Sequence, residues 1–311
     1  MKVLITGGTG FVGAHFTEYL LGEPDWEIYS LERLTPQKNK LGALAFSPRV
    51  HHLYHDFTAE FPDWLLQELD GVDYIVHMGA EVHGLRSLGN PELFVRADAL
   101  GTFNMLEAAR KLKPRKFIYV STAETLGETT EFKPEDTTMV PTTPYAAAKA
   151  TGEILSQSYR CSFGVPALIV RSLVLFGERQ GANRFVPTIL KTILDGKPVS
   201  LHVGPEGQCV TRHFLHIREF VKALYWLLQN GQLDTYHVIG PEKTISDVIG
   251  IIGSASGRSV RIQPTAIPSK SHAMRFALQD TKLSDVYRTD TVDEDITSTV
   301  RWYTDNQNWL K

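Results

Sequence analysis

The stretch Met1-Lys-Val-Leu-Ile-Thr-Gly-Gly-Thr-Gly-Phe-Val-Gly13 says most about the architecture of this chain. Its first half is a short apolar run that predicts a strand, and the residues after the glycines have helical spacing. Gly7, Gly10 and Gly13 follow the pattern G-x-x-G-x-x-G. The first glycine allows a tight turn, the second lets backbone approach a pyrophosphate, and the third lets helix and strand pack closely. We therefore expect a dinucleotide site at this turn.

An acidic residue stands where such a site requires one. Glu32 ends the next predicted strand, about 20 residues after the glycine turn. Its carboxylate should accept hydrogen bonds from the adenosine ribose and repel a 2′-phosphate, which favours NAD over NADP. Arg33, the next residue, keeps NADP as an alternative cofactor, because an arginine could pair with the 2′-phosphate. NAD is the expected cofactor, with the N–H groups of Phe11 and Val12 facing its phosphates.

Strand-like and helix-like segments alternate over the first 175 residues. The predicted strands are Val3–Thr6, Glu27–Leu31, Val50–His55, Val72–Met78, Lys116–Thr122 and Pro166–Ser172, and the predicted helices are Phe11–Leu21, Trp64–Leu69, Phe94–Leu112 and Tyr145–Phe163. This order predicts an α/β fold, a Rossmann-type doubly wound parallel sheet with ligands at the carboxyl ends of its strands.

The pattern changes after Gly177. We expect residues 1–175 to form the NAD-binding domain and residues 212–240 to return to it. Residues 176–211 and 241–311 should form a smaller C-terminal α/β substrate lobe.

The composition is that of an ordinary soluble enzyme. Of 311 residues, 42% are hydrophobic and 22% charged, with a net charge of −3. Nothing indicates a nucleic-acid or membrane partner, and no apolar run approaches the ~20 residues that span a bilayer. The two cysteines exclude a disulfide framework and a cysteine metal cluster, so we expect no metal and a cytoplasmic location.

A tyrosine and a lysine form the candidate catalytic pair. Thr143 and Pro144 read as the cap and first residue of a helix, which places Tyr145 in its first turn and Lys149 one turn along the same face. A lysine cation and a nicotinamide charge beside the phenol should lower the pKa of Tyr145 towards neutrality. Thr122, at the end of the preceding strand, completes the group.

At this point the chain resembles the extended short-chain dehydrogenase/reductases that act on nucleotide sugars, the NAD-dependent epimerases and dehydratases. Within them it is most similar to the 4,6-dehydratases, with the dTDP-glucose 4,6-dehydratases the best-matching pattern. The resemblance runs from Lys2 to Trp309. The segments that carry it include Glu32–Thr35, His77–Ser87, Gly101–Arg110, Ser121–Gly127, Phe176–Gln180, Arg212–Phe214 and Trp302–Trp309.

The resemblance implies tightly held NAD, a lobe that grips a nucleoside diphosphate sugar, and homodimers through the helices Phe94–Leu112 and Tyr145–Phe163. It adds cofactor positions at Asp56, Phe57, Gly79 and Ala80, although Asp56 could instead cap a helix. Substrate positions are implied at Glu81, Gln180, Asn183, Arg184, Phe185, Arg212 and Arg275. The residues of the second lobe among them could equally be surface or packing residues.

Three positions depart from the dTDP-glucose pattern. Ala123 replaces the acid proposed to protonate the departing 6-hydroxyl, as in 4-epimerases, while Glu124 matches dehydratases and UDP-glucuronate decarboxylases. Val174 replaces an asparagine near the substrate phosphates. Asp98 replaces an asparagine near the cofactor, where it could shift helix packing.

A nucleotide-sugar 4,6-dehydratase is the function we expect. Tyr145, aided by Thr122, would take the C4 hydroxyl proton while hydride passes to NAD, and Glu124 would remove the C5 proton before water leaves C6. Glu124 could otherwise be a solvated carboxylate at a strand end. The alternatives are a 4-epimerase, a UDP-glucuronate decarboxylase-like enzyme and a non-catalytic NAD-binding regulator.

Overall fold

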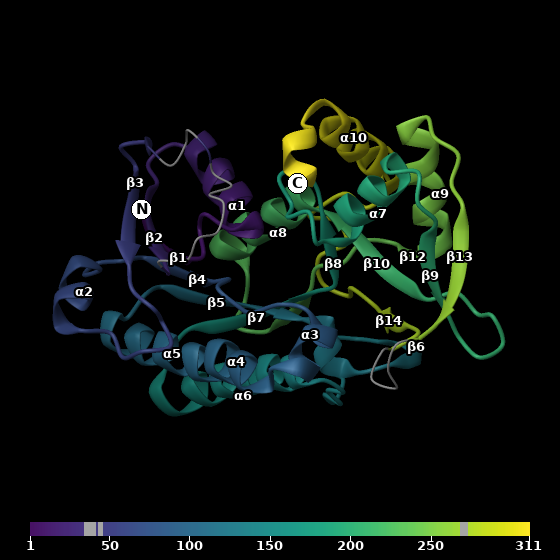
Figure 1. Ribbon diagram of the computed structural model, residues 1–311. Helices are drawn as coiled ribbons and strands as arrows, with labels where there is room; N and C mark the ends of the chain where they lie inside the picture. Colours follow the sequence, from purple (N-terminus) through teal and green to yellow (C-terminus); the bar gives the residue numbers. More distant parts are fainter. Residues whose placement is uncertain (34–41, 43–45, 268–272) are drawn as a thin grey trace.

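A seven-stranded parallel sheet forms the larger part of the molecule. The computed structural model describes residues 1–33, 42, 46–267 and 273–311. The strand order is β3-β2-β1-β4-β5-β7-β11 (Figure 1). The strands are β1 (Lys2–Thr6), β2 (Glu27–Glu32), β3 (Val50–Tyr54), β4 (Tyr74–His77), β5 (Lys116–Thr122), β7 (Ala167–Ser172) and β11 (Thr235–His237). The order reverses between β1 and β4, which confirms the predicted Rossmann-type sheet.

Helices cover both faces of this sheet (Figure 1). On one face α1 (Phe11–Gly22) and α8 (Ile217–Asn230) share a buried core with the strands. On the other face lie α2 (Asp63–Glu68), α5 (Gly101–Leu112) and α6 (Pro144–Phe163), which share a second core. Because both faces are covered, the strands read as nearly continuous apolar runs, and this is why the sequence predicts them well.

The helix predicted over Phe94–Leu112 is more complex than its sequence indicates. It begins with α4 (Pro91–Phe94), continues through a π-helical segment, η2 (Val95–Leu100), and becomes α5. A further short helix, α3 (Gly84–Gly89), precedes it. The η2 segment packs against α6, which carries the candidate catalytic pair.

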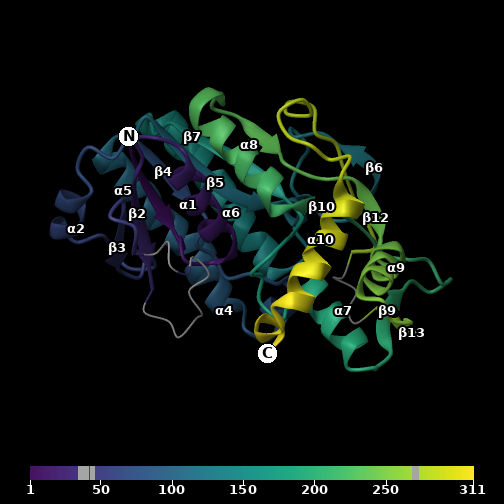
Figure 2. The ribbon, with the colours of Figure 1, turned by 90° about the horizontal axis from the view of Figure 1, so that it is seen from above.

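The second lobe lies at the opposite end of the molecule from α2 (Figures 1 and 2). Its three-stranded sheet has the order β12-β10-β8, and two strand pairs, β13-β9 and β14-β6, stand beside it. Its helices share an apolar core with these strands. The elements are β6 (Thr129–Lys133), β8 (Val174–Phe176), α7 (Phe185–Leu194), β9 (Val199–Val203), β10 (Thr211–His216), β12 (Glu242–Thr244), α9 (Ile245–Ser256), β13 (Ile262–Ala266), β14 (Phe276–Leu278), α10 (Val292–Asp305) and η4 (Gln307–Leu310).

The chain crosses between the two parts several times. Of residues 212–240, α8 packs on α1 and β11 pairs with β7, whereas β10 pairs with β8 and β12 in the smaller sheet. Farther on, Leu283 and Tyr287 enter the apolar core around α1 and α8. The two parts are therefore joined by several segments rather than by a single linker.

Candidate active site

The glycine turn joins β1 to α1 in the backbone geometry that its sequence allows. Gly7 has a φ of 71°, a left-handed conformation that favours glycine, and Gly10 N donates to its carbonyl at 2.9 Å. A side chain at Gly13 would collide with the Gly7 carbonyl oxygen and lie 2.7 Å from the Gly8 Cα. The first N–H groups of α1, from Phe11 on, lack partners within their helix, so the turn offers donors to an anion.

Glu32 is held against this turn. Its carboxylate accepts hydrogen bonds from Thr9 N and Thr9 Oγ1, both at 2.8 Å, and from Ser30 Oγ at 2.5 Å. The end of β2 and the glycine turn thus form one unit. The contact of Glu32 with the ribose hydroxyls stays a prediction.

Arg33 and Arg86 share the carboxylate of Glu81. Arg33 Nη2 donates to Glu81 Oε1 and Arg86 Nη1 donates to Glu81 Oε2, each at 2.9 Å. Glu81, a predicted substrate residue, therefore binds two arginines of the protein. Since Arg33 is already paired with a carboxylate, a 2′-phosphate would have to compete for it.

The four further cofactor positions lie at the ends of β3 and β4. Asp56 Oδ1 accepts from Thr58 N at 2.9 Å, so it caps a turn rather than a helix. Phe57 is buried, with its ring 5.2 Å from that of His77. Gly79 packs over the Phe57 ring, and the half-buried Ala80 follows it. The Phe57 side chain therefore belongs to the core, and its place beside the cofactor stays a prediction.

Tyr145 and Thr122 come together as predicted. Thr143 caps α6 by accepting from Ala146 N at 3.1 Å, and Tyr145 follows Pro144 in the first turn. Tyr145 N donates to Ser87 Oγ of α3 at 3.1 Å. Thr122, at the carboxyl end of β5, lies near the phenol of Tyr145 and acts to lower its pKa.

The protein groups around Tyr145 raise its pKa rather than lower it. Burial is the main cause, and the carboxylates of Glu124 and Asp98 add to it, while Thr122 and Arg184 act in the opposite direction. Lys149 is not among the groups that shift the pKa of Tyr145 most. The protein groups alone therefore do not lower the phenol pKa, and the lowering expected from Lys149 together with the nicotinamide charge stays a prediction.

Lys149 is anchored one turn away from Tyr145. Its Nζ donates to Val120 O at 2.6 Å and lies 4.3 Å from the centroid of the Tyr119 ring. Burial lowers the pKa of Lys149, and the carboxylates of Asp98 and Glu153 oppose this shift. The ammonium is thus fixed beneath the end of β5, where carboxylates of the protein balance its charge.

Glu124 lies beside Tyr145 on the short 3-10 turn η3 (Ala123–Leu126). Its backbone N donates to Thr122 Oγ1 at 3.3 Å, and its Oε2 would lie 2.9 Å from a Cβ added at Gly84. Burial raises the pKa of Glu124, and Arg212 opposes that rise. A carboxyl with a raised pKa, next to a buried phenol, suits proton transfer.

Two arginines of the second lobe reach the same region. Arg212 donates to the carbonyls of Thr211 at 2.7 Å, Ala273 at 2.8 Å and Met274 at 3.2 Å. Burial lowers the pKa of Arg212 to about 10, and the charge of Glu124 acts against this. Arg184, at the start of α7, interacts electrostatically with Tyr145.

The remaining substrate candidates serve other contacts. Gln180 Nε2 donates to Leu175 O at 2.8 Å, and the Phe185 ring lies 5.6 Å from that of Phe214 in the lobe core. Arg275 binds both carboxylate oxygens of Glu242 at 2.6 Å, whereas Asn183 is exposed. Among the substrate candidates of the second lobe, Arg184 and Arg212 are the side chains near Tyr145 and Glu124.

Sequence reasoning missed the contribution of α3 and the loop before it. Ser87 supports Tyr145, Gly84 lies against Glu124, and Arg86 pairs with Glu81. His83 precedes this helix with a φ of 110°. All of these residues stand in the segment His77–Ser87 that carries the resemblance, but their contacts depend on tertiary packing.

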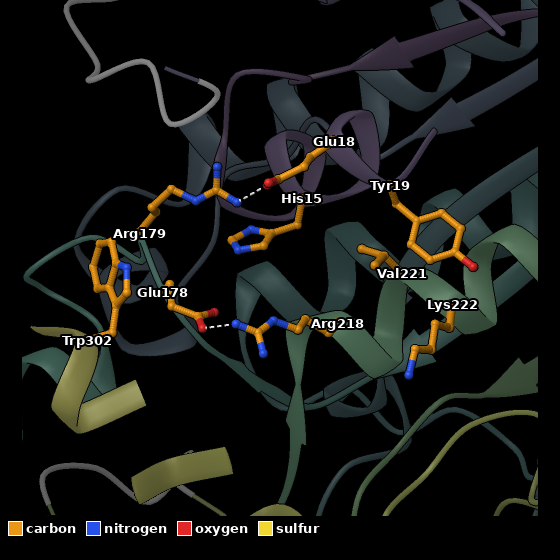
Figure 3. A pocket seen from close by; sticks show the side chains of 9 residues that line it. All are labelled: His15, Glu18, Tyr19, Glu178, Arg179, Arg218, Val221, Lys222 and Trp302. Atoms are coloured by element: carbon orange, nitrogen blue, oxygen red, sulfur yellow. Dashed lines mark hydrogen bonds and ion pairs between the residues drawn. The ribbon is translucent and has the colours of Figure 1, made fainter. Parts of the chain in front are cut away.

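A cavity of about 560 Å³ lies between α1, α8 and α10 (Figure 3). Ion pairs join Arg179 to Glu18 and Arg218 to Glu178 across its wall, and the Trp302 ring faces it. None of the predicted catalytic residues lines this cavity. It marks the junction of the first domain with the second lobe.

Neither a metal centre nor a membrane-spanning helix is found in the described part of the chain. Within those residues, no group of three or more His, Cys, Asp or Glu side chains is arranged to hold a metal ion. Over the same residues, no helix is long and apolar enough to cross a membrane.

The sheet order and the glycine turn together define a dinucleotide-binding fold, with the candidate residues Thr122, Tyr145 and Lys149 at the end of β5 and the start of α6. The model of the NAD dependent epimerase/dehydratase family matches residues 3–240, and the chain belongs to this family. The family predicted from the sequence is confirmed.

Known relatives cover nearly the whole chain. The dTDP-glucose 4,6-dehydratase of Streptomyces antibioticus is 32% identical over 99% of this chain and 94% of its own length. DesIV, a dTDP-glucose 4,6-dehydratase from Streptomyces venezuelae solved with NAD and TYD bound, has a TM-score of 0.91 and 29% identity, covering 100% of this chain and 99% of its own. The UDP-glucose 4-epimerase of Thermus thermophilus, solved with NAD, has a TM-score of 0.87 and 26% identity, covering 98% and 99%.

Proposed function

We propose that this chain is an NAD-dependent nucleotide-sugar 4,6-dehydratase. The observation that carries the proposal is the carboxyl of Glu124, which lies close to Tyr145 and has a raised pKa. A 4-epimerase oxidises and reduces the same carbon and needs no acid–base group at C5. Relatives that cover 99% of the chain carry the name of dTDP-glucose 4,6-dehydratase.

The residues of the first domain fit NAD. The N–H groups at the start of α1 would bind the pyrophosphate, and Glu32 would exchange its contacts with Thr9 and Ser30 for the ribose hydroxyls. The pairing of Arg33 with Glu81 supports NAD over NADP. When bound, NAD supplies reversible hydride storage, and its positive nicotinamide ring would lower the pKa of a nearby phenol.

Tyr145 takes the proton of the sugar 4-hydroxyl in this proposal. Thr122, near the phenol, orients the same hydroxyl. Lys149, held by Val120 O, supplies positive charge on the helix that carries the tyrosine. The 4-ketone formed makes the C5 proton acidic, and Glu124 removes it and passes it to the 6-hydroxyl, which departs as water. The hydride taken from C4 then returns to C6, and C5 takes a proton from solvent, to which Tyr145 releases the proton that it accepted.

The substrate diphosphate would lie between Arg184 and Arg212. Both guanidinium groups are largely buried near Tyr145 and Glu124. At such a site their attraction for an anion is stronger than at an exposed site, because water screens it less. Arg275 is a weaker candidate, since Glu242 occupies two edges of its guanidinium group. Gln180 and Phe185 would shape the pocket through the lobe core.

A homodimer through α5 and α6 is also part of the proposal. Large apolar side chains are exposed at Val95, Leu100 and Phe103 on η2 and α5, and at Ile154 and Phe163 on α6. These helices lie together on one face of the sheet (Figure 1), which offers a continuous surface to a second copy. Sedimentation should give a particle of twice the chain mass, and in Phe103→Glu this mass should fall towards that of a single chain.

The cytoplasmic location stays a prediction.

A 4-epimerase is the second candidate, because Ala123 stands where dTDP-glucose dehydratases carry an acid and is buried in this chain. Solvent deuterium distinguishes the two. In D2O, dehydration by Glu124 should place deuterium at C5 of the product, and Glu124→Gln should abolish this exchange. Full turnover without deuterium at C5 would contradict the dehydratase proposal.

A further inference from the structure

Asp98 is a buried carboxylate that the proposed mechanism does not use. It lies on η2 and is 1% exposed. Its Oδ1 accepts a hydrogen bond from Glu81 N at 2.9 Å. Its Oδ2 has no hydrogen-bond partner within the described part of the chain. Burying half of a carboxylate without a partner is costly, so the environment must either compensate its charge or remove it.

Titratable groups surround Asp98 from four directions. Lys149 and Tyr145 come from α6, Glu81 from the loop after β4, Arg33 from the end of β2, and Tyr119 from β5. Below them, Thr102 Oγ1 donates to Asp98 O at 2.7 Å and lies 3.2 Å from His77 Nε2. These contacts fix the backbone of η2 beneath the catalytic helix, which it packs against.

We propose that Asp98 is a positioning residue whose carboxylate is the buried counter-charge of Lys149 and whose protonation governs how readily Tyr145 releases its proton. The proposal rests on the role of Tyr145 as the proton acceptor of the reaction. Asp98 acts without contacting the reacting carbon. Its effect passes through the electrostatic field that Lys149 and Tyr145 share.

The charges around Asp98 agree with this role. Burial raises the pKa of Asp98 to about 7, and the positive charge of Lys149 opposes that rise. In its ionised form Asp98 raises the pKa of Tyr145, and it also favours the charged form of Lys149. Near neutrality, protonation of Asp98 therefore leaves Glu153 as the other carboxylate that compensates Lys149, and it makes Tyr145 the stronger acid.

Asparagine separates the charge of Asp98 from its structural contact. Asp98→Asn retains an oxygen that accepts from Glu81 N but carries no charge at any pH. Asp98→Ala removes both the charge and the contact. Asp63→Asn, on the exposed surface of α2, is a matched change far from this cluster and should behave as wild type.

The pH profile of kcat/KM tests the proposal. In Asp98→Asn the ionisation assigned to Tyr145 should move to lower pH by about one unit, the size that a buried unit charge produces over several ångströms. The wild-type profile should also contain an ionisation near pH 7, from Asp98, that this variant lacks. Identical profiles for wild type and Asp98→Asn would overturn the proposal. So would a profile that shifts in Asp98→Ala but not in Asp98→Asn, because only the structural contact would then matter.

A spectroscopic measurement keeps this test independent of the substrate. Infrared difference spectra of the NAD-loaded protein should show a protonated-carboxyl band that disappears as the pH rises through about 7 and is missing in Asp98→Asn. Absence of that band would overturn the proposal even if the enzyme is a dehydratase. Its presence in a protein that fails to dehydrate any nucleotide sugar would instead place the error in the proposed function.

Discussion

Arg212 and Glu124 form an electrostatic pair across the boundary between the second lobe and the large sheet. The guanidinium group opposes the rise in the pKa of Glu124 that burial causes, and the carboxylate opposes the fall in the pKa of Arg212. Arg212 is oriented by three backbone carbonyls, so its charge is fixed in place. The lobe that would hold the substrate thus also adjusts the proposed C5 base.

Arg212→Gln should move the acidic limb of the C5 exchange rate to higher pH. Without the guanidinium charge the pKa of Glu124 rises further, and the ionised carboxylate that accepts the proton is lost at a higher pH as the pH falls. The shift should be on the order of one pH unit. Deuterium exchange at C5 across pH measures it, with Arg261→Gln on the exposed lobe surface as control. If the acidic limb of the exchange rate stays at the same pH in Arg212→Gln, the charge of Arg212 does not affect the pKa of Glu124.

Tyr145→Phe should lower turnover by roughly 10²–10⁴-fold, the usual contribution of a positioned proton-transfer group. The ring and its T-shaped contact with Phe94 remain, so NAD affinity and thermal stability should change little. Tyr159→Phe, farther along the same helix, removes a hydrogen bond to Glu107 and should retain activity. Near-normal turnover of Tyr145→Phe would exclude the phenol as the base.

Gly13→Ala should impair NAD binding by deforming the glycine turn. A Cβ at this position meets Gly7 and Gly8 backbone, which has no room to move. Gly22→Ala is the matched control on the same helix, because nothing lies within 4 Å of its added Cβ. Calorimetric titration with NAD should show weakened binding for the first variant alone. Equal affinities would mean that the turn does not contact the pyrophosphate.

Arg171→Met should destabilise the fold beneath the active site. Arg171 binds Glu153 through Nε at 3.0 Å and Nη2 at 2.6 Å, and Ser121 Oγ donates to the same carboxylate at 2.5 Å. Leaving Glu153 buried without its partner should cost roughly 3–5 kcal/mol of unfolding free energy. Arg96→Met, which breaks an exposed pair with Glu92, should cost less than about 1 kcal/mol. Urea denaturation compares the two, and equal losses would contradict this ranking.

The sequence predicts the large sheet well because its strands are buried on both faces. Lys116–Thr122 is found with its predicted bounds, and the five other strands predicted in the first 175 residues differ from the structure by no more than two residues at either end. The three-residue strands β8, β12 and β14 escaped prediction because they are too short to show an alternation. The strand β6 escaped it because its sequence, TTEFK, is mostly polar and its middle residues are exposed. The π-helical η2 was read as ordinary helix, because local propensity does not report the packing against α6 that accompanies it.

The candidate site could be predicted only where a motif fixes the backbone. The glycine turn, Thr122 and Tyr145 come together because strand ends and helix starts meet at one edge of the sheet. Arg275 and Gln180 stood in suitable segments, but a sequence does not reveal which way a side chain turns. Spacing alone likewise does not show that Lys149 reaches Val120 O, or that burial raises the pKa of Tyr145 among the protein groups.

The mass of the product is the decisive measurement for the dehydratase proposal. The purified protein, with NAD, is incubated with dTDP-glucose, UDP-glucose, GDP-mannose and UDP-glucuronate, and each product is weighed by mass spectrometry. We predict that one of the hexose nucleotides loses a single water and gains a 4-keto group, and that Glu124→Gln forms none of this product. An unchanged mass with inverted C4, or loss of carbon dioxide from UDP-glucuronate, would contradict the dehydratase assignment.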